Sequence, residues 1–99
     1  MVIVHELDVI AVENNFSVAG MSVVAIERTK WASRLPCCSY FRAEKTYPLR
    51  NYHYHAGSGM FIMVTVTDKA EAEIWQFVVH NAEMRKNLCD QLPESVLVL

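Results

Sequence analysis

Two side chains near the end of the chain combine polar chemistry with an apolar setting. Asn81 and Arg85 lie four residues apart in the segment Asp68–Leu92, whose pattern predicts a helix, so both fall on one helix face, a turn apart. A cation on an apolar face requires a carboxylate, carbonyl groups or an anionic ligand. We therefore take Arg85 and Asn81 as candidate ligand-binding residues for a carboxylate or phenolate, which the planar guanidinium suits.

A structural ion pair is the alternative role for Arg85. The carboxylates of Glu6, Asp8 and Glu44 are the expected partners, or the long side chain reaches solvent at a subunit contact. The two interpretations differ in what lies beside Arg85. A ligand site requires an open cleft there, whereas an ion pair leaves the guanidinium fully paired.

The second candidate pair is His53 and His55, which point the same way if the chain is extended. An imidazole at a pocket rim can bind a ligand or transfer a proton near neutral pH. A His-x-His pair can also begin a metal site, which Cys37, Cys38 or His5 would have to complete. Since no further ligands stand at a metal-binding spacing, we predict no metal and no cofactor, and loop or surface histidines are the simpler alternative.

The segment Asp68–Leu92 carries the clearest helix pattern. Asp68 can cap the helix with Glu71 as its reciprocal partner, and Pro93 ends it. At about 100° per residue, the apolar side chains cover an arc of roughly 220°, which predicts burial on more than one side. The arc consists of Ile74, Trp75, Phe77, Val78, Val79, Ala82, Met84, Leu88, Cys89 and Leu92.

Strands are predicted on both sides of this helix and at the start of the chain. Val2–Val12 is rich in β-branched residues and is expected to bury its odd-numbered face. Cys37–Ala43 and Met60–Thr67 are also predicted strands, the second a central one, and Glu94–Leu99 closes the chain as another. Glu44–Gly59 is predicted to be a long connection with a short extended piece.

The segment Ser17–Leu35 fits two structures. A helix is favoured by an apolar arc and by Pro36 at its end, with Ser17 as a possible cap. A hairpin is favoured by a turn at Asn14–Asn15 followed by a β-branched stretch, Phe16–Ile26. With the helix, the element order is strand, helix, strand, strand, helix, strand, which is the ferredoxin-like split βαβ fold of the α+β class. With the hairpin, the alternative is a β meander with one long helix.

With the helix, the chain resembles the dimeric α+β barrel superfamily. The segment Leu35–Tyr40 (LPCCSY) looks like that superfamily's entry into its second strand. Met60–Thr67, running into Asp68–Ala72 and a helix with Trp75 and His80, is similar to its third strand and second helix. The resemblance implies a small homodimer in which two sheets pack together, in a group that includes cofactor-free monooxygenases and haem-handling enzymes.

The overall composition limits the classes of partner. The 99 residues allow one domain, residues 1–99, and 53% of them are hydrophobic, which exceeds average usage and predicts burial in a homo-oligomer. A net charge of −2, with nine scattered Lys and Arg, predicts no nucleic-acid partner. No apolar stretch approaches the ~18–20 residues that cross a bilayer, and no signal-peptide pattern begins the chain, so we expect a cytoplasmic protein without a membrane partner.

Two functions from different classes follow. The first is a small homo-oligomeric domain that binds an aromatic or carboxylate-bearing ligand in a helix–sheet cleft, through Arg85, Asn81, His53 and His55. Whether such a domain also catalyses a reaction stays open. The second is a non-enzymatic interaction or oligomerisation protein without a small-molecule site, whose apolar surplus is used entirely in protein contacts.

Overall fold

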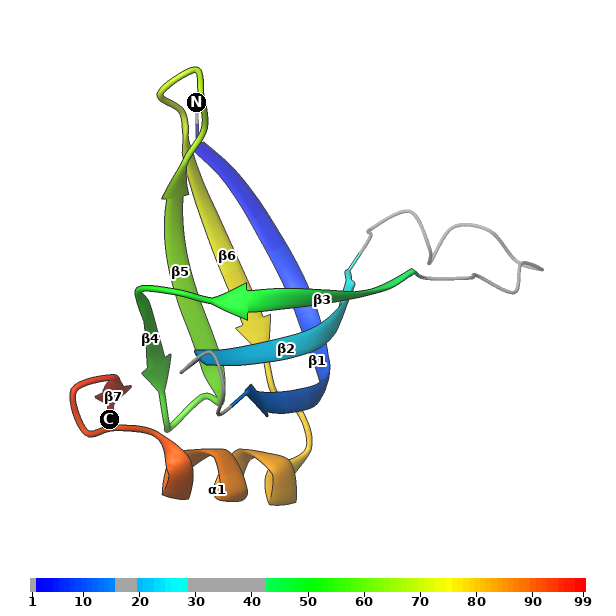
Figure 1. Cartoon of the computed structure of the whole chain (residues 1–99), viewed down its shortest axis with the longest axis vertical. Helices are drawn as coiled ribbons and strands as arrows, with labels where there is room; N and C mark the ends of the chain where they lie inside the picture. Colours follow the sequence, from blue (N-terminus) through cyan, green and yellow to red (C-terminus); the bar gives the residue numbers. More distant parts are fainter. Residues whose placement is uncertain (1, 16–19, 29–42) are drawn as a thin grey trace.

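The computed structural model describes residues 2–15, 20–28 and 43–99. The described residues form seven strands and one helix: β1 (Val2–Asn15), β2 (Gly20–Glu27), β3 (Glu44–Leu49), β4 (Tyr52–His55), β5 (Met60–Val66), β6 (Ala72–Val78), α1 (Ala82–Gln91) and β7 (Leu97–Val98). The strands make one sheet in the order β3-β2-β1-β6-β5-β4-β7 (Figure 1). Neighbours are antiparallel except for β1 with β6 and β4 with β7, which are parallel.

The sheet is strongly coiled, so that distant strands face each other across a shared interior. β2 and β3 cross over the lower parts of β5, β6 and β1 in Figure 1. The ring of Tyr47 on β3 lies 5.9 Å from that of Trp75 and 5.5 Å from that of Phe77, both on β6. Tyr52 on β4 donates a hydrogen bond to the sulfur of Met21 on β2 at 3.6 Å. These contacts close the interior.

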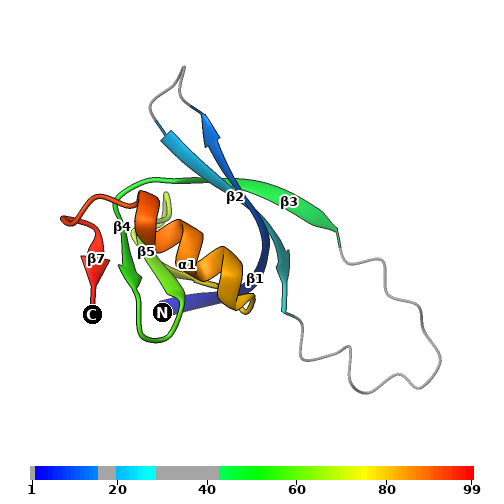
Figure 2. The same ribbon diagram turned by 90° about the horizontal axis from the view of Figure 1, so that it is seen from below.

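Two local features produce the coil. The register of β1 against β2 shifts between Val9 and Ala11, which marks a β-bulge, and a bulge sharpens strand twist. Odd residues of β1 face the interior before the bulge, whereas Val12 packs against the core after it. A corner of two residues joins β3 to β4, where Asn51 adopts a φ of 52°, a conformation that Asn tolerates better than most residues. Figure 2 shows the same coil from below, with α1 across its open end.

The centre of the core is a row of side chains across four strands. Leu7 is paired in register with Phe77, Phe77 with Phe61, and Phe61 with Tyr54, so all four point to the same face. Each is essentially fully buried. Leu88 of α1 closes one end of the core, and the other buried apolar residues are Val9, Val23, Ala25, Leu49, Met63, Val79 and Leu92.

The ferredoxin-like α+β prediction is wrong, because the structure is a mixed sheet with one short helix. Residues 20–27, predicted as helix, form β2, which pairs with β1 as the hairpin alternative required. The turn expected at Asn14–Asn15 is wrong, because both residues belong to β1 and pair with β2. The alternative meander is also incomplete, since β1 and β6 are parallel and the helix has ten residues. The β-branched residues of β2 favour extended backbone, and the strand gains hydrogen-bonded neighbours on both sides, β1 and β3.

The helix predicted over Asp68–Leu92 is wrong over its first half. Thr67 and Glu71 form a turn in which the Glu71 backbone oxygen accepts from the Thr67 N–H at 2.8 Å, and Ala70 has a φ of 60°. This turn joins β5 to β6, so the expected capping box does not start a helix. A helix is present only over Ala82–Gln91, where its end before Pro93 is as predicted. No helix in the described part of the chain is long and apolar enough to cross a membrane.

The remaining predictions divide between confirmed and corrected. The strand predicted over Val2–Val12 is confirmed and extends to Asn15, and Met60–Thr67 is confirmed as β5, which has a neighbour on each side. Glu44–Gly59 is not a long connection, since it holds β3 and β4. The closing strand is reduced to Leu97–Val98 beside β4. Cys37–Ala43 and Leu35–Tyr40 fall almost wholly outside the described residues.

Candidate functional site

The two polar residues singled out on the predicted helix lie at the start of α1. Asn81 is its N-cap, with Oδ1 accepting a hydrogen bond from the Met84 N–H at 2.9 Å, so this oxygen already stabilises the helix. Arg85 is half-buried, and its Nη2 donates to the His80 backbone oxygen at 3.3 Å. Among the described residues, no carboxylate lies within ion-pair distance of Arg85.

Arg85 packs across the turn between β4 and β5. Gly59 in this turn has a φ of +69°, and a Cβ on it would lie 2.9 Å from both Arg85 Nε and the Val79 backbone oxygen. Only glycine fits such a position without displacement. The Nε of Arg85 is buried and has no hydrogen-bond partner among the described residues. Its guanidinium therefore rests on the turn backbone, and it is not one of the residues that line the pocket described below.

Tyr54 lies close to Arg85 in the interior. Its side chain is fully buried, and no group in the described part of the chain meets hydrogen-bond geometry with its hydroxyl, although the weakly bonding thiol of Cys89 lies beside it. Burial raises the pKa of Tyr54, Cys89 beside it raises the pKa further, and the charge of Arg85 lowers it by less. The phenol is therefore neutral near pH 7.

Replacing Tyr54 with phenylalanine should leave the free energy of unfolding unchanged or raise it by up to ~1 kcal/mol, because a buried hydroxyl without a partner costs stability. Urea unfolding monitored by circular dichroism measures this. Tyr52→Phe is the matched control, since the Tyr52 hydroxyl does have a partner, Met21, and its loss should be mildly destabilising. A clear loss of stability in Tyr54→Phe alone would show that its hydroxyl is bonded.

His53 and His55 lie on β4, and both are exposed. They point the same way, as predicted, but Tyr54 between them faces the core, so the two imidazoles lie on the outer face of the sheet. His55 Nδ1 lies 2.8 Å from the Ser58 hydroxyl and accepts from the Ser58 N–H at 3.1 Å, which closes the β4–β5 turn. The structure does not bring these histidines together with the pair on α1, and the ligand-binding roles of all four residues stay predictions.

A metal site receives no support from the described residues. In residues 2–15, 20–28 and 43–99, no three side chains of His, Cys, Asp or Glu gather as metal ligands would. Cys37 and Cys38, considered as partners of the histidine pair, lie outside the described residues.

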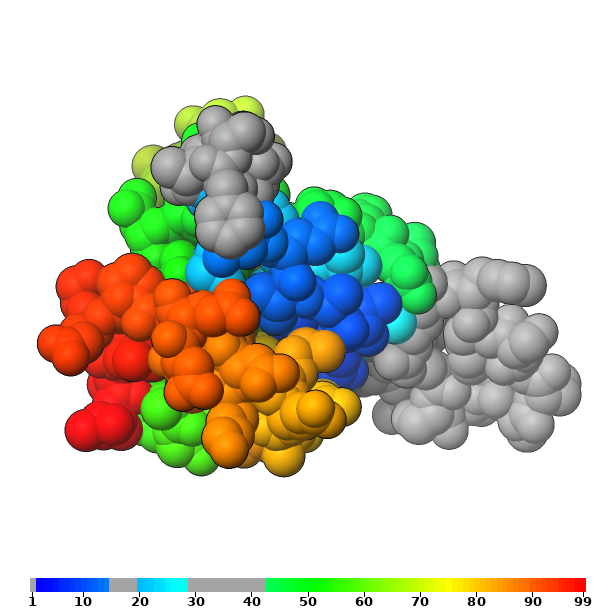
Figure 3. Space-filling model, turned by 60° about the horizontal axis from the view of Figure 1, so that its bottom comes forward, coloured from blue at the N-terminus to red at the C-terminus, as the bar shows by residue number. Residues whose placement is uncertain are grey.

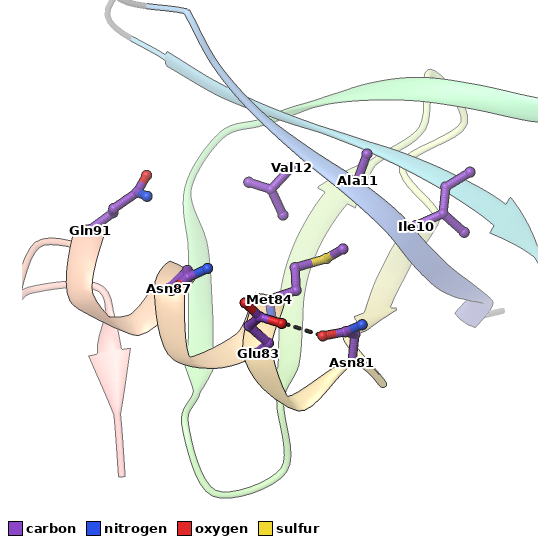
Figure 4. Close-up of a pocket in the computed structure, with 8 residues that line it drawn as sticks. All are labelled: Ile10, Ala11, Val12, Asn81, Glu83, Met84, Asn87 and Gln91. Carbon is purple, nitrogen blue, oxygen red and sulfur yellow. Dashed lines mark hydrogen bonds between the residues drawn. The ribbon is translucent and has the colours of Figure 1, made fainter.

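A pocket of about 490 Å³ opens between the bulged part of β1 and α1 (Figure 4). β1 contributes Ile10, Ala11 and Val12 to its lining. The helix contributes Asn81, Glu83, Met84, Asn87 and Gln91. In the space-filling view of Figure 3, the blue surface of β1 borders the orange surface of α1 directly. The lining divides evenly between apolar and polar side chains, so the pocket offers both apolar contact and hydrogen-bonding groups.

A cluster of three charged or polar side chains holds the segment that precedes α1 against β1. Asp8 on β1 accepts from Arg28 Nη2 at 2.6 Å, and the same carboxylate oxygen lies 2.8 Å from His80 Nε2. Arg28 foremost, and also His80, hold the pKa of Asp8 below its ordinary value, against the opposing effect of burial. The cluster ties β1, the end of β2 and the segment before α1 together, so Asp8, expected to pair with Arg85, has other partners.

This lowered pKa predicts an acid-dependent loss of stability. Because the folded pKa of Asp8 lies below its unfolded value of ~3.9, its contribution is complete above pH ~4 and is lost as the pH falls through the folded pKa. In Asp8→Asn, the melting temperature should decline less steeply below pH 4 than in the parent protein. The corresponding difference in unfolding free energy should be less than ~1 kcal/mol, because solvent screens the ion pair. Glu94→Gln, at an exposed position, should follow the parent curve; equal slopes in all three proteins would contradict the prediction.

A second cluster lies on the inner face of β1 and β6. The His5 ring stacks on Trp75 with centroids 3.9 Å apart, and its Nε2 lies 2.9 Å from Glu73 Oε2. Trp75 Nε1 donates to the Thr65 hydroxyl at 2.9 Å, and Glu27 Oε1 lies 3.9 Å from His5 Nδ1. Stacking and pairing account for the partial burial of His5 without a ligand.

The outer face of β1, β6 and β5 carries a grid of apolar side chains in two rows. In one row, Val4 is paired with Ile74 and Ile74 with Val64; in the other, Ala72 is paired with Val2 and with Val66. We call these six residues the valine patch. Val2, Val4, Val64 and Val66 are 58%, 51%, 60% and 70% exposed. Six neighbouring apolar side chains without a charge form an exposed patch of the kind that marks an interaction site.

No protein-family model matches this sequence, and no curated protein or solved structure matches it. The resemblance to the dimeric α+β barrel superfamily therefore rests on the two sequence segments alone. In the second of them, Asp68–Ala72 leads into the strand β6, where that superfamily would have a helix.

Sequence reasoning missed the valine patch although its signal is visible. Val2 and Val4, and likewise Val64 and Val66, are two residues apart, and a strand places residues with this spacing on one face. The sequence contains no comparable pattern for the pocket. Its lining depends on the bulge between Val9 and Ala11, and a bulge changes which residues of a strand face the interior.

Proposed function

We propose that this protein is a self-associating interaction protein, and that the valine patch is its interface with a second copy of the chain. One observation carries the proposal: six uncharged apolar side chains form two complete rows across three neighbouring strands, and the four valines among them are exposed. Figure 1 helps to locate the patch on the sheet. It lies toward the upper ends of β1, β6 and β5, on the face of the sheet opposite to the one that β3 packs against.

The size of the patch suits the centre of a modest interface. Its four valines are each more than half exposed, and the largest apolar patch of a monomer, typically ~300–600 Å², is often a functional surface. A stable interface buries ~800 Å² per partner, with an apolar centre and a polar rim. Glu6 and Gln76, in the next row of the same face, provide polar groups for such a rim.

A second copy is the occupant that the chemistry favours. The patch offers no charge to select a charged partner, whereas a two-fold axis through Ile74 places the same apolar grid on both sides. Two outer faces can then pack as sheets do, ~10 Å apart. The high hydrophobic content of the chain predicted a homo-oligomer, and in this proposal part of the apolar excess lies in the valine patch.

We propose, as the sequence predicts, that the protein acts in the cytoplasm. The free thiol of Cys89 suits a reducing compartment, in which disulfides are rare.

The test is the molar mass of the purified protein as a function of concentration. Analytical ultracentrifugation over ~1–100 µM should give a monomer–dimer equilibrium with a dissociation constant in the micromolar range, as expected for a small interface. Native mass spectrometry should give the same subunit number and should detect any retained ligand. A monomer at ~100 µM would overturn the proposal.

A further inference from the structure

A surface away from the valine patch offers unpaired strand backbone. β1 pairs with β6 only as far as Asp8 and Val78, whereas its pairing with β2 continues to Asn15. From Val9 to Asn14, β1 therefore has β2 as its one strand neighbour within the described part of the chain. In an antiparallel pair, alternate residues direct their N–H and C=O groups away from the partner. These groups form a free edge that another strand can join.

The pocket between β1 and α1 runs along this free edge. Val12 and Met84 give it an apolar floor, and the flexible Met side chain can adapt to different side chains. The amides of Asn87 and Gln91, both exposed, carry donors and acceptors that suit a peptide backbone. Figure 4 shows these side chains of α1 directed toward the space below β1.

We propose that this groove binds an extended, basic peptide segment of another protein, which joins the free edge of β1 as an additional strand. Backbone hydrogen bonds to β1 would supply affinity, and alternate side chains would contact either the groove or solvent. The dimensions agree: a strand of five residues spans ~17 Å, and the ten-residue helix α1 beside it is ~15 Å long.

The charge of the groove selects a basic peptide. Glu83 is the one charged residue among those that line the pocket, and Glu13 lies exposed just beyond Val12 on β1. No cation lines the pocket, so an acidic segment would find no opposite charge there and would be repelled by Glu83. A Lys or Arg in the bound strand can pair with Glu83.

The experiment selects random nine-residue peptides, displayed on phage, against the protein carrying Val64→Glu, so that its outcome does not depend on dimer formation. Selected peptides should be rich in Lys or Arg and in alternating apolar residues. Asn87→Arg should weaken binding at least ~10-fold, measured by fluorescence anisotropy, because it fills the groove with a repelling cation. Ala82→Arg adds the same charge at an exposed position of α1 outside the lining and should change affinity less than ~2-fold.

Backbone pairing is tested separately from side-chain contacts. The selected peptide, N-methylated at alternate residues, keeps its side chains but cannot form a ladder, and it should lose binding. The unmodified peptide should slow hydrogen exchange in residues 9–14 of β1. The proposal is overturned if selection returns no peptide, if binding ignores Asn87→Arg, or if the methylated peptide binds equally well. It is also overturned if Asn87→Arg in the otherwise unmodified protein dissolves a dimer, since the groove would then hold a second copy.

Discussion

Replacing Val64 with glutamate should convert the dimer into a monomer, with association weakened by more than ~100-fold, equivalent to ~2.7 kcal/mol. Val64 is 60% exposed in the single chain and lies at the end of the row that begins with Val4. A carboxylate there is solvated in the monomer but loses water in the interface without gaining a partner. Two-fold symmetry places the substitution on both sides, so the penalty acts twice.

Sedimentation at matched concentrations measures the effect, and two further measurements make it specific. The exposed Thr46 on β3 provides the control: Thr46→Glu adds the same charge to a strand outside the patch and should leave the dimer intact. Thermal unfolding of Val64→Glu as a monomer should remain cooperative, because the substituted side chain is exposed. If Val64→Glu and Thr46→Glu both remain dimeric, the valine patch is not the interface.

The parts of the fold that could be predicted from sequence are those set by local patterns. The strands over Val2–Val12 and Met60–Thr67 are rich in β-branched residues, which favour extended backbone in almost any context. The end of α1 before Pro93 is equally local, since proline cannot continue the hydrogen-bond pattern. These features needed no knowledge of what packs against them.

The wrong helix over Asp68–Leu92 shows what local patterns cannot decide. Asp68 and Glu71 satisfy the capping-box spacing, yet they occupy a hairpin turn, because Asp is also a favoured turn residue. The apolar arc of roughly 220° does not distinguish the two structures, because a strand with two apolar faces gives an equally wide arc when its residues are plotted on a helix. In the sheet, Trp75 and Phe77 face the core while Ile74 faces outward.

For the candidate site, the sequence predicted which residues matter but not what they contact. Asn81 and Arg85 do fall at one helix, but the helix begins at Ala82, so the amide caps it and the guanidinium rests on Gly59. Which carboxylates meet which cations depends on a parallel pairing of β1 with β6 across 70 positions of sequence. Such long-range pairing leaves no local signal, so Asp8 could be named only as one of three possible partners of Arg85, and its contact with His80, 72 positions away, could not be predicted.

Replacing Phe77 with alanine should lower the free energy of unfolding by ~3–5 kcal/mol, the largest stability effect that we expect from one substitution. Phe77 is fully buried in the central row, paired with Leu7 on one side and Phe61 on the other, and its ring packs against Tyr47 of β3. Its loss opens a cavity where both layers of the coiled sheet meet. Since a small domain is stable by only ~5–10 kcal/mol, the milder Phe77→Leu, costing ~1–2 kcal/mol, keeps the test measurable.

Val78 provides the matched control, because a strand places it on the opposite face from Phe77 whereas the 220° helical arc includes both residues. Val78 is only half-buried and outside the core cluster, so Val78→Ala should cost ~1 kcal/mol or less. Urea unfolding of the variants at one protein concentration gives the comparison, since a dimer's stability depends on concentration. A large loss at both positions would contradict the strand β6 and, with it, the register that builds the valine patch.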